Sequence, residues 1–225
     1  MHRVVALCLN GLVAFDLTAP AQAFGLAARP GGEPLYEFST CSVGGAEVRT
    51  TSGFGVSPSA GLSALRGADT VVVPAYADIL EPPPPEAIAA LRAAGRRGAR
   101  VLSVCSGAFA LAHAGLLDGR RAATHWAWAG ELARRFPAIE VDPDALYVDE
   151  GEVTTSAGLS AGIDLSLHVI RKDFGAAAGE RVARHMVAAA HGGDSKRRER
   201  GAPCATEAYA PTTARSSGMT AKARR

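Results

Sequence analysis

Cys105 is the residue whose surroundings most favour chemistry. It stands between a short apolar run, Arg100 to Val104, and a segment of small residues that begins Ser106-Gly107-Ala108. Small residues after a strand permit the strained turn called a nucleophile elbow, which exposes a side chain above a sheet. The free N–H groups at the helix start lower the pKa of a thiol there and can hold an oxyanion. We expect a reactive or ligand-sensing Cys105; the competing interpretation is a buried structural cysteine.

The two residues after this cysteine are candidate ligand contacts. Ser106 can offer its backbone N–H and its hydroxyl to a ligand, or it can simply cap the helix that follows. Gly107 adds a second backbone N–H at the same turn. The other cysteines are Cys8 and Cys41, inside predicted strands, and Cys204, in a polar tail. Their wide spacing predicts neither a disulfide framework nor a metal site, and no cofactor is expected.

The elements that must position Cys105 alternate along the chain. Apolar runs of strand length are followed by segments with helical patterns of apolar residues. The predicted strands are Val4–Leu9, Tyr36–Val43, Thr70–Val73 and Arg100–Val104, with short pieces at Ile139–Val141, Leu146–Val148 and Glu152–Thr154. The predicted helices are Asp16–Ala28, Glu86–Arg97, Gly107–Ala114, Trp126–Phe136, Ser160–Lys172 and Gly175–Ala190. Residues 44–68 receive no assignment.

This alternation predicts an α/β fold, a doubly wound, mostly parallel sheet flanked by helices on both faces. Ligands of such sheets bind at the carboxyl ends of the strands, so the residues after Leu9, Val73 and Val104 are the first to consider. The last three strand pieces are expected to form a small antiparallel excursion around the turn at Gly151.

Length, composition and charge limit the class of protein to which the chain can belong. The chain has 225 residues, of which 48% are hydrophobic and 20% charged, as in ordinary globular domains. Residues 1–191 hold 16 Lys and Arg against 19 Asp and Glu, which offers no basic groove for nucleic acid. The first apolar run is broken by Asn10-Gly11, and no run approaches the length of a membrane span. We expect a cytoplasmic protein.

The stretch Val104-Cys105-Ser106-Gly107-Ala108-Phe109 resembles the cysteine elbow of the ThiJ/PfpI superfamily, whose fold is flavodoxin-like and of the class I glutamine amidotransferase type. Further segments resemble the branch that contains AraC-type regulators of the GlxA kind and bacterial isonitrile hydratases. These segments are Phe15–Pro20, Gly115–Arg120, Thr124-His125-Trp126, Thr155–Gly158 and Ala161–Asp164. The resemblance covers residues 3 to 191, and its spaced motifs are more specific than the elbow alone.

The resemblance implies roles for two more residues. Asp16 matches the acidic residue that approaches the elbow cysteine in this superfamily, where a carboxyl can exchange a proton with the thiol or a substrate. An N-cap is its alternative role. His125 lies in a stretch that the resemblance marks as pocket-lining, and it can be a base, a ligand contact or a structural histidine. Ser106 stands where peptidase-like members carry His, and no convincing Glu accompanies His185 or His191, so protease and glutaminase activities are disfavoured.

Residues 192–225 are expected to differ from the body. They carry eight Lys and Arg against three Asp and Glu and almost no large apolar residues, which predicts a disordered basic tail. Regulators of the GlxA kind continue into a helix-turn-helix region that binds DNA, which we do not find here. Our hypothesis is a regulator truncated by a frameshift; the alternative is a genuine basic tail with weak attraction to nucleic acid.

The sequence therefore favours one function and leaves a second as the alternative. In the first, residues 1–191 form the ligand-sensing domain of an AraC-type transcriptional regulator, which binds a small-molecule effector, forms a homodimer and reaches DNA only through the absent helix-turn-helix region. In the second, the domain is an enzyme resembling isonitrile hydratase: Cys105 attacks the substrate, Asp16 moves the proton, and the N–H groups of Ser106 and Gly107 steady the intermediate.

Overall fold

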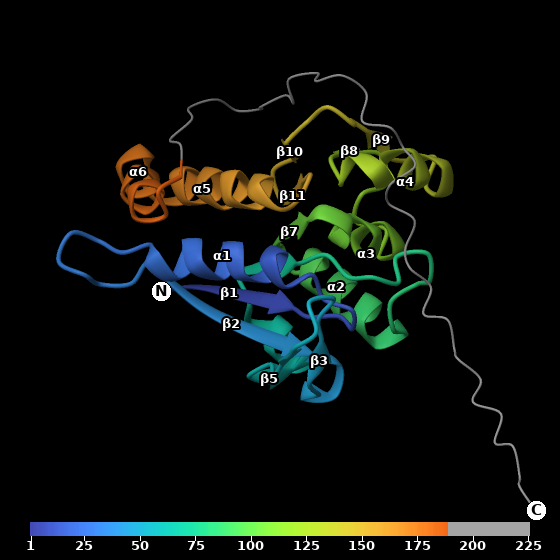
Figure 1. The fold of residues 1–225 in the computed structure, drawn as a ribbon, viewed down its shortest axis with the longest axis horizontal. Helices are drawn as coiled ribbons and strands as arrows, with labels where there is room; N and C mark the ends of the chain where they lie inside the picture. The colour runs from blue at the N-terminus through green and yellow to red at the C-terminus, as the bar shows by residue number, and fades with distance from the viewer. Residues whose placement is uncertain (189–225) are drawn as a thin grey trace, which may run out of the picture.

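The computed structural model describes residues 1–188. The predicted boundary at residue 191, the tail 192–225 and Cys204 lie outside the described residues, so the expectations about them stay predictions. The first 188 residues form one α/β unit with helices on both sides of a central sheet (Figure 1).

The sheet has seven strands in the order β10-β11-β7-β6-β1-β2-β5. Every neighbouring pair is parallel except β10 and β11, which are antiparallel. The strands are β1 (His2–Leu7), β2 (Tyr36–Ser42), β5 (Ala60–Gly61), β6 (Thr70–Val73), β7 (Arg100–Val104), β10 (Tyr147–Asp149) and β11 (Val153–Ser156). Two small sheets pair β3 (Val48–Arg49) with β4 (Gly55–Val56) and β8 (Arg121–Ala122) with β9 (Glu140–Val141).

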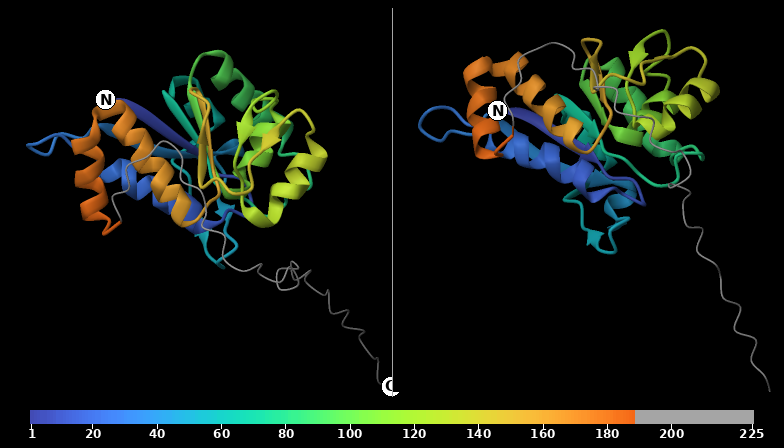
Figure 2. Two further views of the ribbon diagram at one scale, coloured as in Figure 1. Left: turned by 90° about the horizontal axis from the view of Figure 1, so that it is seen from above. Right: turned by 45° about the horizontal axis from the view of Figure 1, so that its top comes forward.

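Helices form a layer on each face of this sheet (Figure 2). On one face lie α1, α5 and α6, and on the other lie α2 and α3, with α4 further out. The helices are α1 (Ala14–Leu26), α2 (Pro85–Arg96), α3 (Ala108–His113), α4 (Ala129–Arg135), α5 (Ser160–Phe174) and α6 (Ala176–His185). Short 3-10 turns are η1 (Val43–Gly45), η2 (Leu62–Gly67), η3 (Cys105–Gly107) and η4 (Trp126–Trp128).

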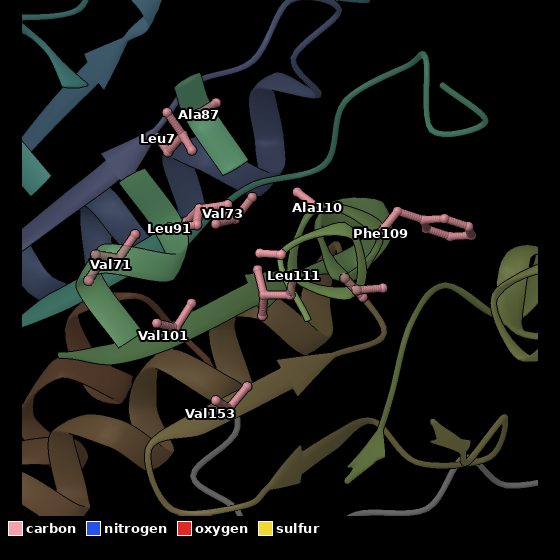
Figure 3. Close-up of a cluster of buried hydrophobic side chains, with 14 of the residues drawn as sticks. Leu7, Val71, Val73, Ala87, Leu91, Val101, Phe109, Ala110, Leu111 and Val153 are labelled. Carbon is pink, nitrogen blue, oxygen red and sulfur yellow. The ribbon is translucent and has the colours of Figure 1, made fainter. Parts of the chain in front are cut away.

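Each face of the sheet has its own apolar core, because successive side chains of a strand point to opposite faces. Val5 and Leu7 of β1 join the core under α2 and α3, whereas Val4 and Ala6 join the core under α1 and α5. Figure 3 shows part of the first core, in which Leu91 of α2 and Leu111 of α3 lie with residues of β6 and β7. This double burial explains why the strands are continuous apolar runs rather than alternating ones.

The predicted fold class is confirmed, and the main differences concern residues 44–68 and residues 126–156. The strand over residues 153–156 is not a separate excursion: it pairs in parallel with β7 and extends the main sheet, and only β10 beside it is antiparallel. The helix predicted over Trp126–Phe136 is divided, since residues 126–128 form a 3-10 turn before α4. Residues 44–68, which had no assignment, hold the β3–β4 hairpin, β5 and η2.

The sheet has a switch point between β1 and β6. From β1 the chain passes through α1 to β2 on one side, and from β6 it passes through α2 to β7 on the other. Connections that leave two adjacent strands in opposite directions open a crevice at the carboxyl ends of those strands. The residues after Leu7 and Val73 border this place, and those after Val104 lie one strand away.

Candidate functional site

The site is built around Cys105, which directly follows β7 and begins the turn η3. Its backbone has φ of 58°, a left-handed conformation that costs a non-glycine residue about 1–3 kcal/mol. Two contacts hold this turn. The hydroxyl of Thr124 donates to the carbonyl of Cys105 at 2.9 Å, and Gly107 packs so closely on the Val73 carbonyl that a Cβ at Gly107 would overlap with it. The geometry is that of the predicted elbow.

Asp16 reaches the elbow from the first turn of α1. Its side chain is 0% exposed, and its Oδ1 accepts a hydrogen bond from the backbone N–H of Leu159 at 2.7 Å. The carboxyl interacts with the Cys105 thiol. Its Oδ2 is buried, and among the described residues no partner meets hydrogen-bond geometry with that oxygen. Asp16 makes no cap hydrogen bond within α1, so its carboxyl faces the thiol and does not cap the helix.

The electrostatics of this pair correct one expectation. Burial, and then the carboxyl of Asp16, raise the pKa of Cys105 to about 12, against the lowering effect of the N–H and hydroxyl of Ser106. Burial likewise raises the pKa of Asp16. We predicted a lowered pKa for the thiol, and the pKa is raised instead. Cys105 is only 9% exposed, and its ionisable neighbour is a carboxyl rather than a cation. At neutral pH the pair retains a proton.

Ser106 and Gly107 lie at the thiol, as the sequence indicates, and both are buried. The Ser106 N–H interacts with the sulfur, while its hydroxyl donates to the carbonyl of Tyr76 at 3.2 Å. The hydroxyl of Ser106 is therefore already engaged in joining the elbow to the segment after β6. Gly107 is the position where only glycine fits against the neighbouring strand.

His125 is half-buried and lies one residue beyond Thr124, which hydrogen-bonds to the elbow. Its Nδ1 accepts a hydrogen bond from the N–H of Ala127 at 3.3 Å, so the imidazole caps the turn η4. The ring also lies beside that of Trp126, with centroids 5.4 Å apart. The structure thus places His125 on the segment that borders the elbow and gives it a capping role.

Sequence reasoning missed the contribution of the loop before α5. A Cβ at Gly158, whose φ is +92°, would overlap with the Cβ, Cα and sulfur of Cys105. The next residue, Leu159, supplies the N–H that fixes Asp16. The stretch Thr155–Gly158 was among the segments that carry the resemblance, but nothing in the sequence indicated that it closes over the thiol.

Three further findings concern the described residues. Within residues 1–188, no group of three or more His, Cys, Asp or Glu side chains is arranged to hold a metal ion. Among the described helices, none combines the length and apolar character needed to cross a bilayer. Cys8, Cys41 and Cys105 are free thiols.

The doubly wound sheet and its buried cysteine elbow define the class of the domain. The model of the DJ-1/PfpI family matches residues 2–172, so the chain belongs to this family. The chain is 42% identical over 139 residues to an uncharacterized protein encoded in the cpoL 5' region of Streptomyces lividans, covering 61% of this chain and 96% of that protein.

The other similar proteins include longer regulators. The HTH-type transcriptional regulator GbdR of Pseudomonas aeruginosa is 30% identical over 169 residues, which is 75% of this chain but 46% of the regulator. The isonitrile hydratase of Pseudomonas putida is 38% identical over 85 residues, or 38% of this chain and 36% of that enzyme. The crystal structure of an AraC family transcriptional regulator from Pseudomonas putida has the same fold, with a TM-score of 0.73, 21% identity, and coverage of 83% of this chain and 100% of that one.

Proposed function

We propose that the domain is the ligand-sensing part of an AraC-type transcriptional regulator. The observation that carries this proposal is the likeness to the regulator GbdR, which extends over 75% of this chain, whereas the likeness to isonitrile hydratase covers 38%. The chain spans about half the length of that regulator, so DNA binding belongs to a separate region. As part of a regulator, the domain acts in the cytoplasm, where it meets its effector.

The elbow supports sensing over turnover. A thiol whose pKa is raised to about 12 is almost wholly protonated at neutral pH and is a weak nucleophile. The buried Oδ2 of Asp16 lacks a hydrogen-bond partner among the described residues, so a ligand with a donor group would satisfy it. Ser106 borders the same thiol, and His125 lies on the neighbouring segment, directly after Thr124. Cys105 and Asp16 therefore suit recognition of a small polar effector.

A second function is favoured by the contact between thiol and carboxyl. In an isonitrile hydration, the thiol adds its sulfur and proton across the terminal carbon and forms a thioimidate. Water then adds to that carbon, and the thiol leaves with its proton restored, which releases a formamide. Asp16 would carry the proton between sulfur and substrate, and the N–H of Ser106 would face the reacting centre.

One set of samples distinguishes the two functions. The wild-type chain and the Cys105→Ser and Asp16→Asn variants are incubated with n-butyl isonitrile, and N-butylformamide is followed by proton NMR. Melting temperatures are measured in parallel against a panel of small polar metabolites. Stabilisation by a panel member that is weakened in both variants, without formamide production, supports a sensor. Formamide production that both variants lose establishes the enzyme and overturns the sensor.

We further propose that the domain forms a homodimer. Phe15 and Leu159 lie beside the site and are each 46% exposed, and large apolar side chains that are exposed together can form a contact surface. They project next to the Asp16–Leu159 contact that joins α1 to α5. Light scattering after size exclusion tests the association: Phe15→Ser should shift the dimer towards monomer, whereas Phe54→Ser, at an exposed position on the β3–β4 hairpin, should leave it unchanged.

A further inference from the structure

A concave place lies at the switch point of the sheet, and Cys105 is not among the residues that line it. It is a cleft of about 470 Å³ between the ends of β1 and β2, the start of the β3–β4 hairpin and the segment after β6. A volume in this range suits a small molecule. The cleft is lined by Cys8, Leu9, Asn10, Ser42, Val43, Ala46, Glu47, Val48, Tyr76, Asp78, Glu81 and Pro82–Pro84.

The charged residues that line the cleft are all of one sign. Glu47, Asp78 and Glu81 supply three carboxylates, and no Lys or Arg contributes to the lining. None of the three forms an ion pair with another residue in the range 1–188. The three carboxylates come from two separate segments that face the same cleft, so their negative potential adds there.

The inner wall of the cleft combines a buried polar group with an apolar surface. Tyr76 lines the cleft and is only 4% exposed, and its hydroxyl is buried without a hydrogen-bond partner among the described residues. Burial, and then the negative charge of Asp78, raise the pKa of this hydroxyl, which places it near the acidic side of the cleft. Pro82, Pro83 and Pro84 form an apolar wall whose fixed φ angles reduce the cost of ordering this segment on binding.

The spacing of these groups favours an organic cation over a metal ion. The three carboxylates are too dispersed to coordinate one metal ion, since residues 1–188 hold no such cluster. An ammonium ion with an apolar body can contact the prolines, Leu9 and Val48 while remaining close to several carboxylates. We propose that this cleft binds a small organic ammonium cation. The site is independent of whether Cys105 senses a ligand or catalyses a reaction.

The experiment measures binding of probe cations to the full chain by isothermal titration calorimetry. The probes are n-butylammonium and n-butyltrimethylammonium, with 1-pentanol as the neutral comparison and magnesium chloride as the inorganic one. The variants are Asp78→Asn, Glu81→Gln and Glu47→Gln, which keep the shape of the side chain. Glu180→Gln, on the exposed face of α6 and outside the cleft, is the matched control.

We expect at least one ammonium probe to bind, and each cleft variant to weaken it by about fivefold, the size of a partly exposed charge interaction. Added sodium chloride should weaken binding as well, because these charges are screened. Tyr76→Phe tests the buried hydroxyl and should weaken n-butylammonium more than the quaternary probe, which has no N–H to donate.

Several outcomes would overturn the proposal. These are the absence of binding by both ammonium probes, equal binding of 1-pentanol, tighter binding of magnesium, or equal loss in Glu180→Gln and Asp78→Asn. Far-ultraviolet circular dichroism shows that each variant is folded, so a loss of binding cannot be attributed to unfolding. Cys105→Ser should bind the probes as the wild type does, which separates this site from the elbow function.

Discussion

Cys105 and Asp16 are two acids placed in one buried space, where burial raises the pKa of both and the carboxyl of Asp16 further raises the pKa of the thiol. Losing both protons would leave two negative charges in a place from which water is excluded. The pair therefore titrates as a unit, and its behaviour belongs to neither side chain alone. The positive φ of Cys105 and the absence of a side chain at Gly158 allow the loop before α5 to pack directly against the thiol.

The first prediction concerns the reactivity of this thiol. Because its pKa is raised to about 12, iodoacetamide should label Cys105 slowly at pH 8, and the rate should rise about tenfold per pH unit above that. Asp16→Asn removes a negative neighbour and should lower the pKa of the thiol, so labelling at pH 9 should be about tenfold faster. Peptide mass spectrometry gives the rate at this cysteine, with Cys105→Ser as the blank. Slower labelling of Asp16→Asn would mean that the carboxyl activates the thiol.

The second prediction concerns Gly158. Gly158→Ala places a methyl group where Cys105 already lies and should destabilise the fold by roughly 2–4 kcal/mol. Gly151→Ala is the matched control, because its φ of +84° is similarly unfavourable for alanine but its Cβ would meet open space. Urea denaturation measures both. Equal free energies of unfolding would show that the overlap is relieved by movement of the loop.

The sequence indicated which residues lie at the candidate site, but it did not indicate the direction in which the pKa of Cys105 is shifted. The strand end before Cys105 and the small residues after it are local signals, and both are present in the structure. The contact of Asp16 with the thiol came only from the family resemblance, because no local pattern relates residues 89 positions apart. The raised pKa of Cys105 depends on burial by Gly158 and other distant residues, which a helix-start argument leaves out.

At the scale of elements, a partly buried ion pair joins α5 to the amino ends of the strands. Arg100 of β7 donates to both oxygens of Asp173 at 2.8 and 2.6 Å, and the hydroxyl of Tyr36 in β2 donates to the same carboxylate at 2.8 Å. Side-chain exposure is 19% for Arg100 and 12% for Asp173. One carboxylate thus connects two strands and a helix.

The third prediction follows from that arrangement. Asp173→Ala should cost about 3–5 kcal/mol, because it leaves a guanidinium and a phenol buried without their acceptor. Glu33→Ala removes the exposed Arg29–Glu33 pair and should cost less than about 1 kcal/mol. Chemical denaturation of the two variants gives the comparison. Similar losses would show that solvent replaces the carboxylate of Asp173 without difficulty.

The fourth prediction is a pH dependence at the contact between α5 and β10. Burial acts to raise the pKa of Asp149, but hydrogen bonds from His168, Lys172 and the Gly151 N–H outweigh it and lower the pKa from 3.8 to about 2. Because the folded pKa is the lower one, this contribution is complete above about pH 5 and is lost as the pH falls towards 2. It should amount to about 1–2 kcal/mol.

Urea denaturation of the wild type and Asp149→Asn at pH 5 and pH 2.5 measures this contribution as the difference between the two pH dependences. Other carboxyl groups titrate in the same range and cancel in that difference. The wild type should lose more stability than the variant on acidification. Equal losses would mean that Asp149 titrates as it does in an unfolded chain.

The elements that sequence patterns predicted best were those buried on both faces. β6 and β7 begin and end where continuous apolar runs indicated. The segment over residues 44–68 could not be assigned, because strands of two residues are held by distant partners: β5 exists through its pairing with β2. The membership of β11 in the main sheet also depends on a tertiary pairing, with β7, that a run of four residues cannot reveal.

At the scale of the whole molecule, the two cores share one sheet and should unfold together. Leu91 is buried in one core and Phe24 in the other. Leu91→Ala should cost about 2–5 kcal/mol and Phe24→Ala about 3–5 kcal/mol. Each should shift the single transition seen by both tryptophan fluorescence and far-ultraviolet circular dichroism. A Phe24→Ala variant whose fluorescence midpoint does not move would show that the two faces unfold separately.

Tyr76 stands between the cleft and the cysteine: its side chain lines the first, and its carbonyl accepts the hydroxyl of Ser106 beside the second. Thermodynamic reciprocity then applies to the two places. Whatever free energy an occupant of the cleft adds to one chemical state of Cys105, that state must add to the binding of the occupant. A titration of the thiol with and without a bound cation therefore measures the coupling between the acidic cleft and the buried sulfur, and an unchanged titration is the result for two independent places.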